Sequence, residues 1–210
     1  GCSDTVNVCV IDLGAPSVSI LTQTDVTCFN GCDGFAQIQV FGGAPPVQYS
    51  WYDQNNQAIN QTTASASNLC AGTYTGEMVD ANGCQASINV VINQPSALNG
   101  IISSSDDVTC FGDCDGEATV TASGGTAPYT YQWNDPNLQV GLSANNLCPG
   151  NYNVTIIDDN NCNLDVPATI AEPLQLLLSA STVDAFCNTP TGSASVSITN
   201  GGINPFSYLW

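Results

Sequence analysis

Cysteine is the residue of this chain whose chemistry is easiest to recognise. There are eleven cysteines in 210 residues, and two pairs have the spacing Cys-x3-Cys, at Cys28/Cys32 and Cys110/Cys114. Closely spaced cysteines either bind zinc or form disulfides. The chain has no histidine to complete a zinc site, and a third occurrence, which begins at Cys187, has Thr191 in place of the second cysteine. We therefore expect disulfides, an oxidising compartment and no confidently assigned metal site.

Carboxylates are the only side chains left for acid–base catalysis, because the chain has no Lys, Arg or His. Two carboxylates can hydrolyse glycosides, but the aspartates here lie mostly in turns and vary between the repeated segments described below. We expect no catalytic residue and no enzymatic activity. The acidic turn formed by Asp113, Asp115 and Glu117 is a weak candidate for calcium, which prefers oxygen ligands. No other cofactor is expected.

The charge balance excludes several classes of partner. Eighteen Asp and Glu residues without any basic residue give a formal net charge of −18. Nucleic acid binding is excluded, since no side chain can neutralise phosphate. Attraction to anionic membranes is excluded for the same reason. The longest apolar run, around Leu176–Leu178, is too short to cross a bilayer, so we expect no membrane insertion.

Two motifs of the chain repeat in register. CFNGCDG at 28–34 returns as CFGDCDG at 110–116, and GGAPPVQYSW at 42–51 returns as GGTAPYTYQW at 124–133 and GGINPFSYLW at 201–210. A period near 80 residues suits independently folded domains in tandem. The predicted boundaries are the last strand of a preceding repeat at 1–15, complete repeats at 16–95 and 96–173, and the first strands of a following repeat at 174–210.

Alternating apolar and polar residues predict β-strands throughout. The complete first repeat is expected to have about seven strands, at 17–27, 35–41, 46–53, 57–59, 63–69, 73–79 and 85–92, separated by Gly- and Asn-rich turns. This pattern predicts an all-β fold of tandem immunoglobulin-like (PKD/HYR-like) β-sandwich domains with a buried Trp. The expected core aromatics are Tyr49, Trp51, Tyr74, Tyr131, Trp133, Tyr152 and Trp210.

The third repeat helps to choose the disulfide pairs. It keeps Cys187 but lacks the second cysteine, so the first two cysteines of a repeat are not expected to be partners. In an immunoglobulin-like strand order, the first turn and the turn before the sixth strand share one end of the sandwich. We therefore predict Cys32–Cys70 and Cys114–Cys148, with Cys28–Cys70 as the alternative.

The remaining cysteines raise the possibility of bonds between repeats. Cys28 and Cys84 are expected at opposite ends of one domain. The hypothesis is that Cys28 of one repeat reaches Cys162 of the next, as a covalent staple across the junction. Disulfides are also expected for Cys84, Cys110 and Cys187. Cys9 stands at an outward strand position and is expected to be unpaired or in an intermolecular bond.

The motifs together resemble a known family. V-T-C-F-x-x-C-D-G at Val108–Gly116, G-G-x-x-P-Y-x-Y-x-W at Gly124–Trp133, N-L-C-x-G-x-Y at Asn146–Tyr152 and D-x-N-x-C at Asp158–Cys162 resemble the SprB-type repeat. That family occurs in large cell-surface (gliding-motility) adhesins of Bacteroidota. The resemblance implies type IX secretion, display at the extracellular cell surface, and a role in cell adhesion or gliding motility. It transfers no binding residues.

The expected function follows from the repeat and the resemblance together. We expect a segment of a long extracellular repeat adhesin, acting as a disulfide-stabilised stalk whose neighbours are repeats of the same chain. Contact with an extracellular surface or polysaccharide is expected through other regions. The alternative is a structural subunit of a laterally assembled extracellular filament or sheath. A third class, a carbohydrate-binding module, would need exposed aromatics, for which Phe35, Phe41 and Tyr52 are the candidates.

Overall fold

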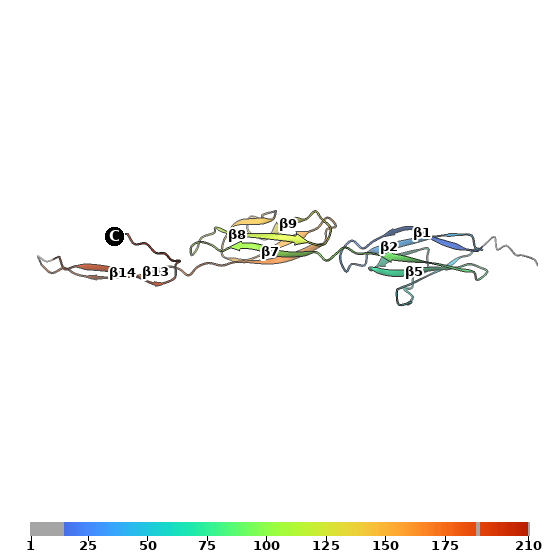
Figure 1. The fold of residues 1–210 in the computed structure, drawn as a ribbon, viewed down its shortest axis with the longest axis horizontal. Helices are drawn as coiled ribbons and strands as arrows, with labels where there is room; N and C mark the ends of the chain where they lie inside the picture. The colour runs from blue at the N-terminus through green and yellow to red at the C-terminus, as the bar shows by residue number, and fades with distance from the viewer. Residues whose placement is uncertain (1–14, 188–189, 210) are drawn as a thin grey trace, which may run out of the picture. The chain divides into compact units, whose positions relative to one another are not determined.

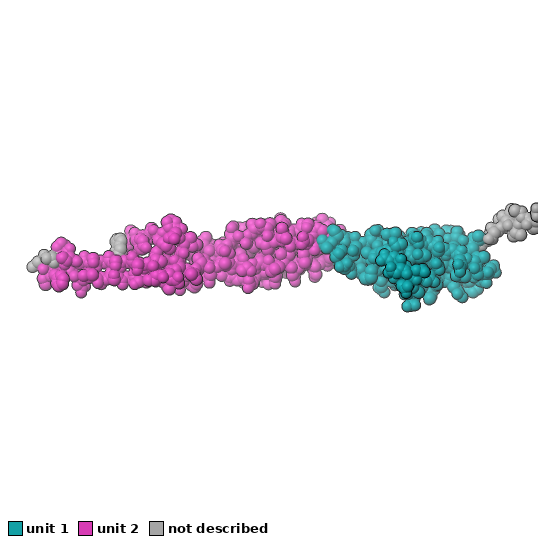
Figure 2. Space-filling model, turned by 60° about the horizontal axis from the view of Figure 1, so that its bottom comes forward, with its two compact units in different colours: residues 1–97 teal, residues 98–210 magenta. Residues whose placement is uncertain are grey.

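The computed structural model describes residues 15–187 and 190–209. The chain divides into two compact units, residues 1–97 and residues 98–210 (Figure 2). The described residues contain β-strands and no α-helix, so nothing in them forms a helix that is long and apolar enough to span a membrane. Each unit is described by itself below, with the strands labelled as in Figure 1.

The first unit is a sandwich of two three-stranded antiparallel sheets. One sheet has the strand order β1-β2-β4 and the other β3-β5-β6. The chain therefore forms β1 and β2 in one sheet, crosses to the other for β3, returns for β4 and crosses again for β5 and β6, in the manner of an immunoglobulin-like domain. The strands are β1 (Ser17–Thr24), β2 (Gly34–Phe41), β3 (Gln48–Tyr52), β4 (Ser65–Leu69), β5 (Gly72–Val79) and β6 (Gln85–Ile92).

The alternating sequence explains which face of each strand is buried. In β2, Ala36 and Ile38 are buried while Gln39 between Ile38 and Val40 is exposed. Successive side chains of a strand point to opposite faces, so the apolar set of each sheet faces the other sheet. Trp51 of β3 is 1% exposed and is the largest side chain of this core. Its indole Nε1–H donates to the Thr63 carbonyl oxygen at 3.0 Å, which satisfies the one polar atom of the ring.

The second unit contains an equivalent sandwich, followed by a hairpin. The sandwich sheets have the orders β10-β8-β7 and β12-β11-β9, and the hairpin pairs β13 with β14. Trp133 is fully buried, and its Nε1–H donates to the Gly141 carbonyl oxygen at 3.1 Å. The strands are β7 (Asn99–Asp106), β8 (Gly116–Ser123), β9 (Thr130–Trp133), β10 (Ser143–Leu147), β11 (Gly150–Ile157), β12 (Asn163–Ile170), β13 (Leu177–Val183) and β14 (Ser193–Asn200).

Each complete sandwich has six strands rather than the expected seven. The segment predicted as a strand at 57–59 makes a single bridge, between Tyr52 and Ala58, and its counterpart bridges Gln132 to Val140. The reason is local. The Asp53 carboxylate accepts hydrogen bonds from the N–H groups of Asn55 and Gln57, in a turn that returns the chain to β3, where the Ile59 N–H donates to the Trp51 carbonyl oxygen at 3.0 Å. Asn60 then has a φ of 57°, which ends the extended conformation and with it the pairing.

The two ends of a sandwich carry different motifs. We call the end at which the chain enters the entry end; in the first repeat it comprises Pro16, Gly42–Gly43 and the 80–84 turn. The opposite, exit end comprises the 25–34 turn, Cys70 and Asn93–Gln94. The ladders define this arrangement: Ser17 pairs with Phe41 near the entry end, whereas Thr24 pairs with Phe35 near the exit end.

Candidate functional site: the cysteine-bearing ends of each repeat

A disulfide closes the exit end of each complete sandwich. The structure joins Cys32 to Cys70 and Cys114 to Cys148. In the first repeat, Gly34 pairs with Leu69 at the end of the β2–β4 ladder, so the two cysteines lie just beyond the last paired residues. In the second repeat, Gly116 pairs with Leu147 in the same way. Each disulfide thus continues an existing ladder and cross-links the two strands at their ends.

A β-bulge at an asparagine lies two residues before the second cysteine of each disulfide. Gly34 pairs with Leu69 and Phe35 with Ser67, so Asn68 is the extra residue on β4. Its φ is 56°, in the left-handed region that Asn tolerates better than most residues. Asn146 has a φ of 54° at the equivalent bulge of β10. This conformation explains why asparagine precedes Leu-Cys in both repeats.

A tyrosine supports the same end from the following strand. The Tyr74 hydroxyl donates to the carbonyl oxygen of Cys70 at 3.0 Å, and the Tyr152 hydroxyl donates to that of Cys148 at 2.8 Å. The backbone of the disulfide is therefore held by a side chain four residues later. Each tyrosine belongs to a Gly-x-Tyr sequence that opens the fifth strand of its repeat, and its bond to a backbone carbonyl four residues upstream is that of a tyrosine corner.

An aspartate holds the first turn of each repeat. The Asp33 carboxylate accepts hydrogen bonds from both the hydroxyl and the backbone N–H of Thr27. Asp115 accepts the same two bonds from Thr109, at 2.6 and 3.0 Å. The threonine hydroxyl, followed by the backbone N–H, lowers the pKa of each aspartate. The sequence carried this signal as Val-Thr-Cys six residues before Asp-Gly, but the pairing was not predicted.

One of the three residues considered for calcium binding has a structural role in this turn. Asp115 uses its carboxylate to hold the turn against Thr109. Within residues 15–187 and 190–209, no three His, Cys, Asp or Glu side chains gather closely enough to hold a metal ion, so Asp113, Asp115 and Glu117 are not brought together as a site.

A second aspartate organises the entry end and was also missed by the sequence reasoning. The Asp80 carboxylate accepts hydrogen bonds from the N–H groups of Ala44, Asn82 and Cys84, at 2.8 to 2.9 Å. Asp80 is buried, and the Ala44 bond is the main cause of its lowered pKa. The aspartate thus ties its own Asp-x-x-x-Cys turn to the Gly-Gly turn 36 residues earlier.

The second repeat has the same entry-end arrangement. Asp158 accepts hydrogen bonds from the N–H groups of Thr126, Asn160 and Cys162, at 2.8 to 3.0 Å. Gly125 has a φ of 57°, and a β-carbon there would lie 2.6 Å from Asp158 Oδ2. The glycine is required both by the backbone conformation and by the close approach of the carboxylate. The Gly-Gly and Asp-x-Asn-x-Cys motifs therefore form one unit of structure.

The remaining cysteines fall into two groups. Cys28 and Cys162 are disulfide-bonded. Cys84, Cys110 and Cys187 are exposed free thiols, so the disulfides expected for these three are not made within the part of the chain that the structure describes. Within the first repeat, Cys28 and Cys84 are too far apart to bond to each other, because Cys28 lies at the exit end and Cys84 at the entry end. Cys9 and Trp210 lie outside the described residues.

The aromatic residues are placed as parts of the scaffold. Trp51, Tyr74 and Trp133 are buried, and Tyr49, Tyr131 and Tyr152 pack against the cores while partly exposed. Burial, with Tyr129 nearby, raises the pKa of Tyr131. Of the aromatics considered for stacking on carbohydrate, Phe41 is 52% exposed, whereas Phe35 and Tyr52 are half-buried.

Known proteins were compared with the chain. Among solved structures it is similar to three N-terminal domains of the Highly Immunogenic Outer Capsid protein of bacteriophage RB49, with 14% identity and a TM-score of 0.48 over 89% of this chain and 70% of that one. It is also similar to the N-terminal eight Ig domains of Down Syndrome Cell Adhesion Molecule, with 16% identity and a TM-score of 0.39 over 75% of this chain and 24% of that one.

A third similar structure is a tetra-tandem repeat in the extending region of a large adhesion protein. It has 16% identity and a TM-score of 0.27 over 91% of this chain and 57% of that one. None of the curated proteins compared with the chain matches it.

A family model described as the SprB repeat matches the chain twice, at residues 20–56 and 102–138. Each match begins in the first strand of a sandwich and ends just beyond its tryptophan strand, and the two matches are offset by the same 82 residues that separate Cys28 from Cys110. The chain therefore has two matches to the SprB repeat, each within one of its tandem all-β, immunoglobulin-like domains.

Proposed function

We propose that this chain is a segment of a long extracellular repeat adhesin, in which the repeats form a disulfide-stabilised stalk for surface attachment or gliding motility. The proposal places the protein at the cell surface of a Bacteroidota bacterium, exported by the type IX system, with its ligand-binding part elsewhere. The role is structural rather than catalytic. In this reading the domain limits are those predicted from the sequence, at 16–95 and 96–173.

The observation that carries the proposal is that the two repeats share one scaffold. Strands β2 and β8 have the same burial pattern residue by residue, and so do β4 and β10. The residues common to both repeats hold turns, disulfides and cores together, as shown above for Asp33, Asn68 and Asp80 and their counterparts. The same framework supports different exposed residues, which is what a spacer requires.

The composition supports an exposed extracellular position. A surface without Lys or Arg offers no cleavage site to proteases that cut after basic residues. Eighteen carboxylates without a compensating base make neighbouring chains repel one another. Disulfides persist outside the cytosol, where thiols are not kept reduced.

We further infer that Cys28 and Cys162 are bonded to each other, as a staple between successive repeats. Both are disulfide-bonded. In the first repeat Cys32 and Cys70 are bonded together and Cys84 is free, so the partner of Cys28 lies outside residues 16–95. The partner of Cys162 lies outside its own repeat by the same reasoning, since Cys114 is bonded to Cys148 and Cys110 is free.

The stalk role is tested by deleting residues 96–173 in frame from the protein in the cells that make it. We expect the protein to remain on the outside of the cell, the cells to attach in still medium, and attachment to fail at a lower shear than before. Deletion of all the repeats should bring the binding region close to the cell and reduce attachment further.

Two results would contradict the stalk. One is strong binding of the purified 210-residue chain itself to the colonised surface or to a glycan array, which would make these repeats the adhesive part. The other is electron microscopy that shows repeats ordered side by side with lateral contacts well above ~1,000 Å², which would favour the filament. Isolated single threads are expected.

A further inference from the structure

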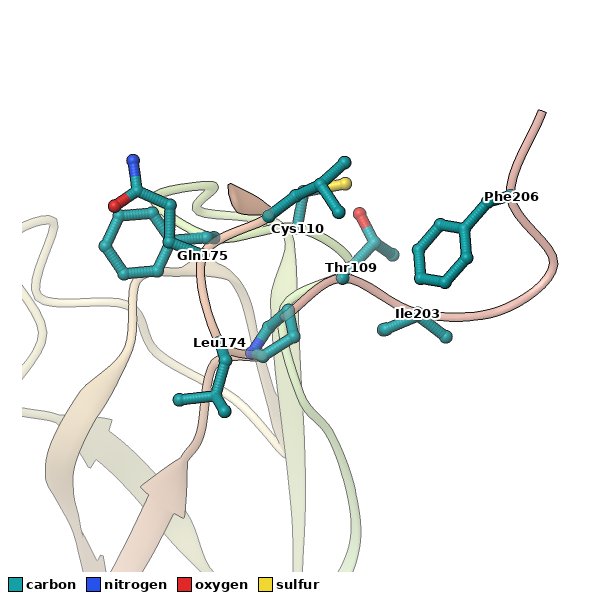
Figure 3. A pocket seen from close by; sticks show the side chains of 10 residues that line it. Thr109, Cys110, Leu174, Gln175, Ile203 and Phe206 are labelled. Carbon is teal, nitrogen blue, oxygen red and sulfur yellow. The ribbon is translucent and has the colours of Figure 1, made fainter. Parts of the chain in front are cut away.

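A groove beside the free thiol of Cys110 is the strongest unexplained feature of the second unit. Its volume is about 690 Å³, and it is lined by three segments, Thr109–Phe111, Pro173–Leu176 and the turn with Gly202, Ile203 and Phe206 (Figure 3). The lining is mostly apolar, yet one wall carries an exposed thiol. The Gly202 N–H donates to the Leu174 carbonyl oxygen at 2.9 Å, so the third-repeat turn is tied to the linker that forms another wall.

We propose that this groove seats the Asp-x-x-x-Cys turn of a complete third repeat, and that its cysteine forms a disulfide with Cys110. The inference extends the staple put forward under the proposed function to the next junction. The partner is thus a segment of the same repeat type, identified by the chemistry described below.

The first argument concerns what a Gly-Gly turn binds. In both complete repeats this turn is covered by the Asp-x-x-x-Cys turn, through the bonds from Ala44 to Asp80 and from Thr126 to Asp158. Gly202 stands at the position of Gly43 and Gly125, and it also has a positive φ, 73°. A completed third repeat would therefore place its own Asp-x-x-x-Cys turn against Gly202, in the groove that Cys110 also lines.

The second argument comes from the equivalent cysteines. Cys110 corresponds to Cys28, and the cysteine of the incoming turn corresponds to Cys162. Both Cys28 and Cys162 are disulfide-bonded outside their own repeats, as shown above. Cys110 differs from Cys28 in that its repeat is followed here by a two-stranded hairpin, which has no Asp-x-x-x-Cys turn.

The reaction is a two-electron oxidation of two thiols. The Cys110 thiolate attacks the disulfide of an oxidant such as oxidised glutathione and releases one reduced thiol. The incoming cysteine thiolate then attacks this mixed disulfide, forms the Cys110 bond and releases the second thiol. The two protons of the protein thiols pass to the two thiols of the reduced oxidant, so the exchange is balanced.

The test counts reactive thiols in a chain with one more repeat. Residues 1–173 are compared with residues 1–173 followed by a second copy of 96–173. Both are equilibrated with reduced glutathione in excess over oxidised glutathione, so that unpaired cysteines return to thiols, then freed of glutathione, denatured and alkylated without further reductant. The added repeat brings four cysteines, the equivalents of Cys110, Cys114, Cys148 and Cys162. We expect no increase in alkylated thiols, because one new disulfide closes within the added repeat and one forms at the new junction, leaving only the added Cys110 equivalent in place of the original.

The outcomes separate this inference from the proposed function. An increase of two thiols would overturn it, whether or not the cells use the protein for attachment. With Cys162→Ser in the added repeat, we expect an increase of one, because the original Cys110 becomes reactive. An increase of four would mean that the added repeat has not folded. In that case the same count is made on a second protein, the 210-residue chain extended by residues 52–94 with Cys70→Ser. A reactive Cys110 in this second protein again overturns the proposal.

Discussion

The carboxylate of Asp80 accepts a hydrogen bond from the backbone N–H of Ala44, 2.9 Å away and 36 residues earlier in the chain. Asp158 accepts the same bond from Thr126. A short polar side chain thus joins two turns that would otherwise be held only by the strands behind them. Because the Asp80 carboxylate accepts these bonds best when it is ionised, the entry end of the first repeat is sensitive to pH.

Acid should destabilise the repeats over a defined pH range. The folded-state pKa values of Asp33, Asp80 and Asp115 are lowered by hydrogen bonds from Thr27, Ala44 and Thr109 respectively. In Asp135, burial acts to raise the pKa, but hydrogen bonds from Gln139 and Asn137 outweigh it and lower the value. A lowered folded pKa contributes stability that is complete above the unfolded value, about 3.9, and is lost as pH falls through the folded value.

We expect the melting temperature to fall mainly below about pH 4. Circular dichroism melts recorded from pH 7 to pH 2 measure this fall. Protonation also relieves the repulsion of a chain with a net charge of −18, which acts in the opposite direction. Asp80→Asn therefore serves as the matched control: it should be less stable than the wild type at pH 7 and lose less on acidification. An equal acid loss in both proteins would contradict the role of Asp80.

Gly125→Ala should destabilise the second repeat more than Gly112→Ala. Both glycines have a positive φ, 57° and 83°, so each substitution has the backbone cost of the left-handed region, roughly 1–2 kcal/mol. Only at Gly125 does the new β-carbon collide, with Asp158 Oδ2, whereas nothing lies within 4 Å at Gly112. Urea unfolding measures both. Equal losses would show that the approach of Asp158 is not tight.

The bulge asparagine can be tested with a pair of substitutions. Asn146 has a φ of 54°, which glycine adopts freely and a β-branched residue does not. Asn146→Val should cost roughly 1–2 kcal/mol, and Asn146→Gly should cost much less. Asn145→Val, at the neighbouring exposed strand position, is the control and should be nearly neutral. A costly glycine variant would show that the asparagine side chain, not the backbone conformation, is what matters.

Removal of the exit-end disulfide should lower the free energy of unfolding without preventing the repeat from folding. The Cys114–Cys148 bond joins residues 34 apart, and loop-closure entropy predicts a loss of roughly 3–4 kcal/mol when both are replaced by serine. Equilibrium unfolding of the Cys114→Ser/Cys148→Ser chain, with the second repeat followed through the fluorescence of Trp133, measures the loss. Cys84→Ser, which removes a free exposed thiol, is the control and should leave stability unchanged.

The fold was largely predictable because the repeats and the strand alternation are both strong signals. Tandem sandwiches and the buried Trp51 and Trp133 follow from period-two patterning between turn residues. The strand at 57–59 was overpredicted, since alternation over three residues does not reveal that Asn60 adopts a positive φ and ends the pairing with β3 after one bridge. The aspartates were read as solvated turn residues because a sequence does not show that Asp80 and Ala44 meet in space. The expectation that the aspartates vary between repeats was wrong at these positions: Asp33 recurs as Asp115 and Asp80 as Asp158, and this repetition was the available signal.

The placement of Cys28 just after β1 and of Cys162 just before β12 has a mechanical consequence. With these cysteines bonded as proposed, a pull along the protein would travel through β1, cross the disulfide and continue through β12. The tension would bypass β2 to β6 and β7 to β11, including both tryptophan strands. The cores would stay folded under loads that extend an uncross-linked sandwich, and only reduction of one sulfur–sulfur bond would expose them. Cell-surface redox chemistry would then set the strength of the tether.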